Sequence, residues 1–462
     1  MTVRHIVSRL SLAFLFWPSP FVLLAQRAAP DSALKAVLQE RVTSKRAVGL
    51  VLVGVEKGKP PRIYTAGTSG SGVALDGNTE FEIGSVTKVF TTALLADMVQ
   101  RGEVHLDDPV SKYLPATVHV PSRAGKEITL LDLATQSSGL PRLPNNLHPA
   151  NIANPYADYS VQQLYDFLSS YELTRDIGSR FEYSNLGVGL LGHVLSLRAG
   201  KSYEALVTER ILEPLGMHDT RITLTPAMLA HLAPGHNDAG AAVANWDLPT
   251  LAGAGALRST ANDMAKFLAA NLDSTLGPVA RDLARAHTPL RDTDQPAMRI
   301  GLAWLTLNPF GTPITWHNGG TGGYHTFIGF DPTHDRGVVI LANSSRSIDD
   351  IGLHTLEPRI PLTVVTVAKV RTEITLDPAK LDAYVGVYEL APTFSIAITK
   401  EGGALFGQAT GQGKFQLFPE TETDFFLKVT DAQITFVRDA TGKIDSLVLH
   451  QGGANTPGRR IK

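Results

Sequence analysis

The stretch FEIGSVTKVF, residues 81–90, decides the fold of the first half of this chain. From Ser85 onward, apolar residues recur at intervals of three and four positions as far as Val99. This spacing predicts an amphipathic helix with its apolar stripe facing a core, and Gly102 is suited to end it. Lys88 lies inside this stretch. Because an unpaired buried charge is costly, Lys88 needs either a partner or a chemical role.

Ser85 and Lys88 form an S-x-x-K pair at the predicted helix start. Residues three apart share a helix face, so the lysine amine can reach the serine hydroxyl. Burial disfavours the ammonium form, and a lysine with a lowered pKa can accept the serine's proton. Backbone N–H groups at a helix N-terminus would also face a developing oxyanion. The alternative is an N-capping serine followed by a surface lysine.

The composition narrows the classes of function. The chain has 462 residues, 43% of them hydrophobic, which is enough for two or more domains. Its net charge of −2 gives no reason to expect nucleic acid or a strongly basic membrane-binding surface. Cysteine is absent from the sequence, which excludes disulfides, a thiolate zinc site and a cysteine nucleophile. No histidine pair has i, i+4 spacing beside a glutamate on a helix, so we expect neither a metal nor another cofactor.

Residues 1–25 have the pattern of a secretory signal peptide. Arg4 and Arg9 form a positive region, and an apolar run interrupted by two prolines follows. Ala25 offers a small residue for cleavage, and Ala28 or Ala29 could serve instead. The alternative is a membrane anchor, but the uninterrupted apolar stretches are short for a span. We therefore expect a periplasmic or secreted protein with no stable membrane span after processing.

The rest of the chain divides into two predicted domains. Residues 47–70 alternate and end in turn residues, which predicts a β-hairpin. Residues 81–272 are mostly helical in pattern, and strand patterns return between 301 and 345. This order predicts an α/β domain over residues 30–370, with an antiparallel sheet and a helical insertion. Short alternating stretches predict a small all-β barrel or sandwich over residues 376–462. Its aromatic residues would supply much of the core, namely Tyr384, Tyr388, Phe394, Phe415, Phe425, Phe426 and Phe436.

A second motif, Y-S-N, stands at Tyr183, Ser184 and Asn185, just before an apolar helical pattern. A phenol held near a cation can act as phenolate and shuttle a proton, and an amide can bind a substrate's amide. The alternative is ordinary helix capping by Ser184 or Asn185, with a packed tyrosine.

A third motif is formed by His317, Asn318, Gly319 and Gly320, where a strand pattern enters a glycine-rich turn. Glycines at such a point permit a ligand to approach the backbone closely. The alternative is an ordinary tight turn with a surface histidine.

The ordered set S-x-x-K, Y-x-N and K/H-x-G resembles the motifs of the penicillin-recognising serine hydrolases, above all the class C β-lactamase branch with its DD-peptidase and esterase relatives. The likeness covers about residues 47–343, and the tail more loosely resembles lipocalin-like C-terminal domains. The implied fold is a β-lactamase/DD-peptidase-like antiparallel sheet with a helical insertion, followed by an all-β barrel-like domain. The stretches that carry the likeness are FEIGSVTKVFTTALLADMVQRGEVHLDDPVSKYLP, ITLLDLATQSSGLP, FEYSNLGVGLLG, ILEPLGMHDT, GALRSTANDMAKFL and HNGGTGGYHTFIGFDP.

The resemblance implies a role for each motif residue. Ser85 would be the acylated nucleophile, Lys88 its activating partner, and Tyr183 the proton shuttle and later the base for the deacylating water. Asn185 would bind the acylamino group of the substrate. The backbone N–H groups of Ser85 and Gly320 would form the oxyanion hole.

The third motif departs from the family pattern. His317 stands where a lysine helps to bind the substrate carboxylate, and Asn318 stands where threonine or serine is usual, before Gly319. Histidine is mostly neutral above about pH 6.5. We therefore expect weaker binding of carboxylated substrates at neutral pH, and stronger binding as the pH falls through about 6.5.

The sequence thus predicts an exported serine hydrolase that forms an acyl-enzyme and needs no cofactor. Its partner would be a small-molecule substrate, either a β-lactam or a D-alanyl peptide of the cell wall. Two alternatives stay open, namely a carboxylesterase of small esters and a penicillin-binding sensor that is acylated without turnover.

Overall fold

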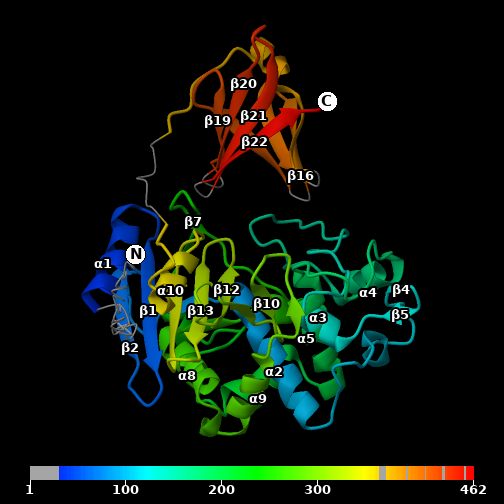
Figure 1. The fold of residues 1–462 in the computed structure, drawn as a ribbon, viewed down its shortest axis with the longest axis vertical. Coiled ribbons are helices and arrows are strands. Elements are labelled where there is room, and N and C mark those ends of the chain that lie inside the picture. Colours follow the sequence, from blue (N-terminus) through cyan, green and yellow to red (C-terminus); the bar gives the residue numbers. More distant parts are fainter. Residues whose placement is uncertain (1–30, 364–370, 392–393, 411–412, 429–431, 452–453) are drawn as a thin grey trace, which may run out of the picture.

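A computed structural model of the chain describes residues 31–363, 371–391, 394–410, 413–428, 432–451 and 454–462 (Figure 1). The predicted signal peptide lies outside these residues. Within them, no helix has the length and apolar character needed to cross a membrane.

The first domain is built on an eight-stranded antiparallel sheet (Figure 1). The N-terminal hairpin belongs to this sheet. Its first strand pairs with the last strand of the domain, and Leu50 lies opposite Ala342. The predicted sheet of N-terminal and later strands is therefore confirmed. In spatial order the strands are β2 (Arg62–Gly67), β1 (Gly49–Glu56), β14 (Arg336–Ala342), β13 (His325–Asp331), β12 (Ile314–Gly320), β11 (Leu305–Leu307), β10 (Met298–Ile300) and β9 (Arg291–Asp292).

Helices and three small strand pairs make up most of the remainder of this domain. The helices are α1 (Asp31–Thr43), α2 (Thr87–Gln100), α3 (Leu130–Ala134), α4 (Val161–Ser170), α5 (Asn185–Ala199), α6 (Tyr203–Val207), α7 (Pro226–His231), α8 (Ala261–Leu272), α9 (Pro278–Ala286) and α10 (Asp349–Leu356). The pairs are β3 (Glu80–Glu82) with β8 (Arg258–Thr260), β4 (Ser122–Arg123) with β5 (Lys126–Glu127), and β6 (Gly235–His236) with β7 (Ala242–Val243).

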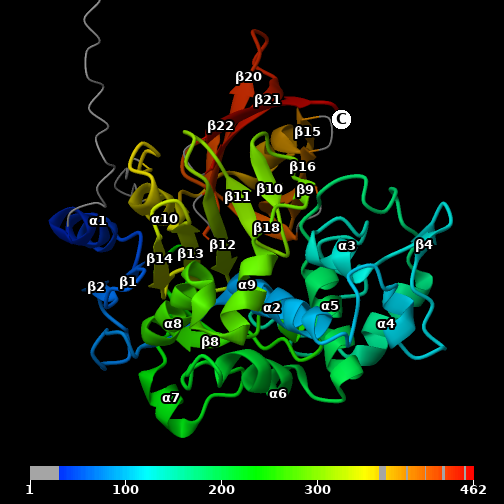
Figure 2. The same cartoon turned by 60° about the horizontal axis from the view of Figure 1, so that its bottom comes forward.

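Alternate residues of β1 belong to two different cores, as the pleat of a strand requires. Leu50 and Leu52 pack with apolar residues of α1 and α10. Val51 and Val53 belong to the larger core, which includes residues of α2, α8 and α9. Figure 2 shows α1 and α10 on one side of the sheet and α8 and α9 on the other. Both faces of the sheet are therefore covered by helices.

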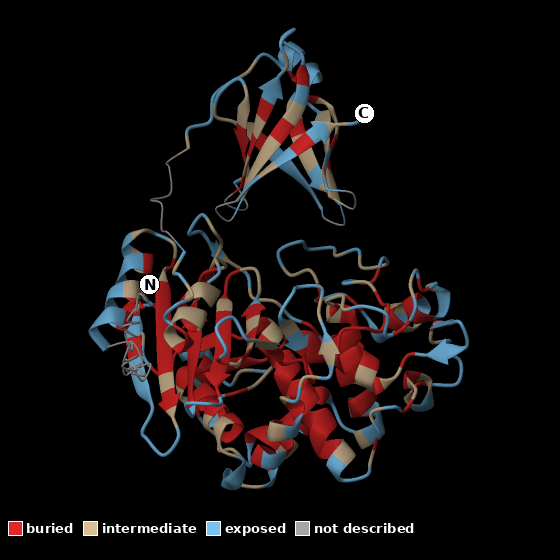
Figure 3. Cartoon of the chain, in the orientation of Figure 1, coloured by how far each residue is buried: buried red, intermediate tan, exposed pale blue. Residues whose placement is uncertain are grey.

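Helix α2 is buried on every side from Thr87 to Met98 (Figure 3). The prediction of a helix there is confirmed, but the prediction of a single buried face is wrong. The polar residues of the helix find partners inside the protein: Thr91 donates to the Gly253 carbonyl at 2.7 Å, and Thr92 to the Leu302 carbonyl at 2.9 Å. Buried hydroxyls that are hydrogen-bonded in this way do not need a solvent-facing side.

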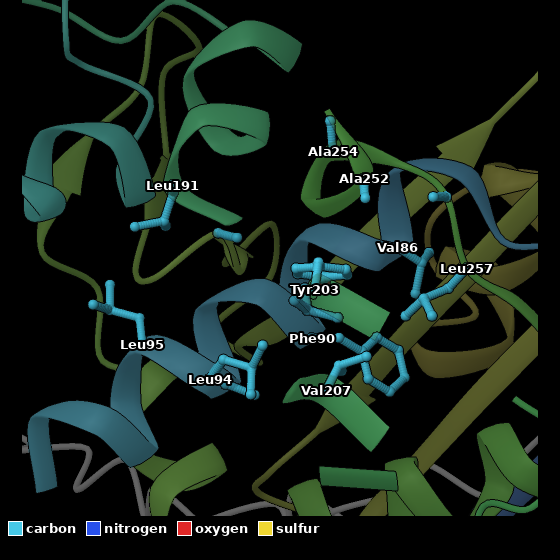
Figure 4. Packing of buried hydrophobic residues seen from close by; sticks show 14 of the residues in the cluster. Val86, Phe90, Leu94, Leu95, Leu191, Tyr203, Val207, Ala252, Ala254 and Leu257 are labelled. Carbon is cyan, nitrogen blue, oxygen red and sulfur yellow. The ribbon is translucent and has the colours of Figure 1, made fainter. Parts of the chain in front are cut away.

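The apolar residues of α2 anchor it in the larger core. Figure 4 shows Phe90 close to Val207 and Leu257, in the same core as Leu94 and Tyr203. The Phe90 ring also stacks on a phenylalanine of α8, with 4.0 Å between centroids. Because the start of α2 lies deep in this packing, side chains that project from its first turn have fixed positions.

The second domain is a closed barrel of eight antiparallel strands. Its core contains Tyr384, Tyr388, Phe425 and Phe436, as predicted, whereas Phe415 is 40% exposed and the prediction that it is a core residue is wrong. The strands are β15 (Gly386–Ala391), β16 (Phe394–Glu401), β17 (Ala404–Ala409), β18 (Lys414–Pro419), β19 (Asp424–Phe426), β20 (Ala432–Arg438), β21 (Ile444–Gln451) and β22 (Ala454–Arg460).

Candidate active site

Ser85 lies in a short 3-10 turn that leads directly into α2. Strand β12 packs tightly against this turn. A Cβ atom on Gly319 would lie 2.0 Å from the Ile83 carbonyl oxygen, and one on Gly84 would lie 2.8 Å from the Gly320 nitrogen. Glycine is therefore required at both contacts, and the backbone of Gly320 lies beside the turn that carries Ser85.

Lys88 projects from the first turn of α2 toward Ser85. Its Nζ atom lies 2.8 Å from Ser85 Oγ, 2.9 Å from Asn185 Oδ1 and 2.7 Å from the Ala254 carbonyl oxygen. The last two atoms can only accept hydrogen bonds. A neutral amine has two hydrogens, so donation to these acceptors leaves its lone pair for the Ser85 hydroxyl.

The surroundings of Lys88 favour this neutral form. Its side chain is fully buried. Burial lowers the pKa of Lys88 well below its usual value, and the positive charge of Arg142 adds to the effect. Lys88 can therefore act as a general base toward Ser85, which is the arrangement that the S-x-x-K spacing predicted.

Tyr183 completes a cluster around Ser85. Lys88 Nζ lies 4.9 Å from the centroid of the Tyr183 ring, and the phenol interacts with Ser85. Burial raises the pKa of Tyr183 to about 12, although Ser85 and Arg142 act in the opposite direction. The predicted use of a phenolate as proton shuttle stays a prediction, since this pKa favours the neutral phenol in the resting site. Tyr183 is a neutral phenol there, with a proton to donate.

Ser184 and Asn185 have separate functions at the start of α5. Ser184 caps the helix, because its Oγ accepts a hydrogen bond from the Gly187 amide at 2.8 Å. Asn185 instead faces Lys88, and its Nδ2 donates to the Tyr156 hydroxyl at 3.4 Å. The Y-S-N motif therefore both caps helix α5, through Ser184, and contributes a side chain to the site, through Asn185.

His317 lies on β12 with its side chain buried, and its ring is 6.3 Å from that of Tyr183. The Nδ1 atom lies 2.6 Å from the Asn318 carbonyl oxygen, so Nδ1 carries the hydrogen and Nε2 keeps a lone pair. Burial and the neighbouring Lys88 lower the pKa of His317 to about 4. The expectation that His317 titrates near pH 6.5 is wrong, because the ring is not in contact with solvent.

Asn318 faces a different neighbour. Its Nδ2 donates to Asp349 Oδ2 at 2.6 Å, and the other oxygen of this carboxylate pairs with His325 Nε2 at 2.9 Å. Successive strand residues point to opposite faces, which explains why Asn318 and His317 have different surroundings. The Asn318 amide group thus holds β12 to the first turn of α10, and its predicted contact with substrate stays a prediction.

Sequence reasoning missed three members of this site. Ala254 contributes only a carbonyl oxygen, which its residue type does not reveal. Arg142 and Tyr156 lie in loops without a repeating pattern, although Arg142 directly follows the stretch that resembles the family. Among the described residues, no group of three or more His, Asp or Glu side chains is placed to hold a metal ion.

This fold with an S-x-x-K pair at its centre defines the class of serine hydrolases that contains β-lactamases and DD-carboxypeptidases. Residues 34–356 match the family described as Beta-lactamase, so the chain belongs to that family. Residues 370–458 match a second family, described as a domain of unknown function (DUF3471).

Individual relatives support the same assignment. The chain is 31% identical over 315 residues to the D-alanyl-D-alanine-carboxypeptidase/endopeptidase AmpH of Escherichia coli K12. The aligned region covers 65% of this chain and 80% of that protein. It is 25% identical over 416 residues to penicillin-binding protein 4* of Bacillus subtilis, covering 83% of this chain and 88% of that one. A β-lactamase/D-alanine carboxypeptidase from Yersinia pestis superposes with a TM-score of 0.62 at 25% identity, over 72% of this chain and all of the other.

Proposed function

We propose that this protein is an exported serine hydrolase that hydrolyses the amide bond of D-alanyl peptides, β-lactams or both, through an acyl-enzyme on Ser85. One observation carries the proposal. The Nζ atom of the fully buried Lys88, whose pKa is lowered well below its usual value, lies 2.8 Å from Ser85 Oγ. The similarity to a D-alanyl-D-alanine carboxypeptidase supports the choice of peptide substrates.

In the acylation step, Ser85 Oγ attacks the carbonyl carbon of the scissile amide while its proton moves to Lys88 Nζ. The negative charge develops on the carbonyl oxygen, beside the backbone N–H groups of Ser85 and Gly320. When the C–N bond breaks, the leaving nitrogen takes the proton of the Tyr183 phenol. Lys88 then returns a proton to Tyr183, so the cluster ends neutral with Ser85 esterified.

Deacylation uses the same groups in reverse. Water attacks the ester carbonyl, and its proton passes to the Tyr183 and Lys88 pair, as microscopic reversibility suggests. The C–Oγ bond then breaks and Ser85 recovers its proton. Once Lys88 has taken the proton of the Tyr183 phenol, the phenolate can accept a proton from the attacking water. The high pKa of Tyr183 makes this phenolate a strong base.

Hydrolysis of small esters is the second candidate, and His317 is the observation that favours it. A neutral imidazole on β12 offers no positive charge to a substrate carboxylate. Esters do not need such a charge, whereas β-lactams and D-alanyl peptides carry a carboxylate. A sensor that is acylated without turnover would share all of these features and differ only in deacylation.

A parallel assay tests the proposal. Purified protein is incubated with nitrocefin, a D-Ala-D-Ala peptide and p-nitrophenyl butyrate, with the Ser85→Ala variant as the matched control. We expect more than one equivalent of product per protein from the peptide or the β-lactam, and none from the variant. Turnover of the ester alone would favour the esterase, and a single equivalent would favour the sensor. Equal activity of the variant would contradict the role of Ser85.

Export is tested separately, by measuring the mass of the protein recovered from its native host. Cleavage near Ala25 predicts a mature chain that lacks about the first 25 residues. Recovery of the full-length chain from the cytoplasm would contradict export without affecting the proposed chemistry.

A further inference from the structure

Arg142 is a cation beside Tyr183 of the site. Its side chain is exposed, and its Cζ atom lies 5.0 Å from the centroid of the Tyr183 ring. Its charge influences two groups of the cluster. It adds to burial in lowering the pKa of Lys88, and it partly offsets the raising effect of burial on the pKa of Tyr183. A guanidinium this close to the proposed reaction can contact a bound substrate.

Within the part of the chain that the structure describes, the guanidinium of Arg142 has no hydrogen-bond or ion-pair partner. No carboxylate oxygen of those residues lies within 4.0 Å of it, and it donates no hydrogen bond to any of them. Arginine donors match the two oxygens of a carboxylate in a planar, bidentate arrangement. The guanidinium lies over the Tyr183 ring, and this cation–π contact leaves its N–H groups free for a ligand.

The backbone fixes the side of the site on which Arg142 lies. Its carbonyl oxygen accepts hydrogen bonds from the amides of Asn185 at 3.0 Å and Leu186 at 3.2 Å. Arg142 therefore belongs to the side formed by the start of α5. The residues beside the oxyanion position, such as Gly320, belong to β12 instead. A positive charge is present on the α5 side, whereas His317 on β12 is neutral.

We propose that Arg142 binds a carboxylate on the acyl portion of the substrate, which is the portion that stays on Ser85 after the leaving group departs. The proposal rests on the acyl-enzyme function stated above. Arg142 would then be a specificity residue. It lies next to Asn185, which is the residue expected to bind the acyl portion of the substrate. The protein would then select acyl donors that carry a negative charge at this end.

Two esters with the same leaving group isolate this contact. Mono-p-nitrophenyl adipate carries a free carboxylate at the end of its acyl chain, and its methyl ester carries none. The measured quantity is the ratio of kcat/KM for the acid to kcat/KM for the methyl ester, after subtraction of the rate without protein. It is measured for the wild type, Arg142→Gln and Arg142→Lys. Arg101→Gln, at the far end of α2, controls for the loss of one positive charge.

The proposal predicts that Arg142→Gln lowers this ratio about tenfold or more, since charge-assisted hydrogen bonds are worth that much. Arg142→Lys should keep part of it, and Arg101→Gln should leave it at the wild-type value. If Arg142 acts only through the pKa values of Lys88 and Tyr183, both esters change together and the ratio stays constant, which overturns the proposal. Hydrolysis of both esters by Ser85→Ala would instead refute the proposed function on which it rests.

Discussion

Asn185 Oδ1 accepts a hydrogen bond from Lys88 Nζ at 2.9 Å, and this contact directs the lone pair of the lysine. The Ala254 carbonyl accepts the second hydrogen at 2.7 Å. Because Asn185 is the first residue of α5, the Y-S-N motif places a side chain against the proposed base, in addition to its proposed contact with substrate. The asparagine thus links two motifs that are far apart in the chain.

Replacing Asn185 with aspartate tests this link. A carboxylate in place of the amide would favour the ammonium form and raise the pKa of Lys88. We expect the acid limb of the kcat/KM profile for p-nitrophenyl butyrate to move to higher pH, with a loss of about a hundredfold at pH 7. Asn185→Ala, which adds no charge, is the control and should leave the position of this limb nearly unchanged. Superimposable profiles for Asn185→Asp and the wild type would contradict the prediction.

The buried His317 gives a second prediction, about pH. With its pKa lowered to about 4, His317 is already neutral at pH 5.5 and stays so at pH 8. KM for nitrocefin, whose carboxylate is ionised throughout, should therefore change little over this range. KM for p-nitrophenyl butyrate serves as the neutral comparison. A fall in KM for nitrocefin alone, as the pH drops through 6.5, would show that His317 titrates near its ordinary value.

The fold was largely predictable because its long elements have clear patterns. The apolar run in β1 and the apolar periodicity of α2 both depend on residues close together in sequence. The complete burial of α2 was not predictable, since the carbonyl groups that satisfy Thr91 and Thr92 come from Gly253 and Leu302. Strand β22 has a weak sequence pattern, because proline and glycine in its sequence, ANTPGRR, are weak strand formers.

In the site, too, some features were predictable from the sequence and others were not. Ser85, Lys88, Tyr183 and Asn185 were predicted from spacing and resemblance, and the structure brings their side chains together. Their protonation states were not predictable from residue type. A pKa depends on burial and on charges that are distant in sequence, such as Arg142 beside Tyr183.

Glu80 leads to a prediction about stability. Its side chain is buried on β3, and neither carboxyl oxygen has a hydrogen-bond partner in the described structure. Burial, together with Asp219 and Asp263, raises the pKa of Glu80 from 4.5 to about 9. Between these two pKa values, the folded state keeps the Glu80 proton and the unfolded state has released it. The unfolded state thus binds fewer protons, and stability falls as the pH rises, by at most about 1.4 kcal/mol per pH unit.

The Glu80→Gln variant has no proton to lose, so its free energy of unfolding should decrease less between pH 6 and pH 9 than that of the wild type. Urea unfolding at both pH values measures the difference. Glu172→Gln, at an exposed position, provides the control and should follow the wild type. An equal decrease in all three proteins would show that Glu80 ionises normally.

The barrel domain gives a prediction about autonomy. Its core is formed by its own residues, including Tyr388 and Phe436, and the proposed catalytic groups all lie between residues 85 and 320. A chain that ends at residue 363 should therefore fold and still be acylated on Ser85. Circular dichroism and labelling with a fluorescent penicillin test this. An insoluble or unlabelled product would mean that the tail completes the first domain.

Proton transfer from Ser85 to a neutral Lys88 is the central step of the proposed mechanism, and the rate of acylation measures it directly. Intact-protein mass spectrometry after rapid mixing with a penicillin gives this rate for the wild type, Ser85→Ala and Lys88→Met. Thermal melting verifies that each variant is folded. We predict one adduct in the wild type, located on Ser85, none in Ser85→Ala, and acylation of Lys88→Met slowed by at least about a hundredfold. Acylation of Lys88→Met at the wild-type rate, or an adduct on another residue, would contradict the account.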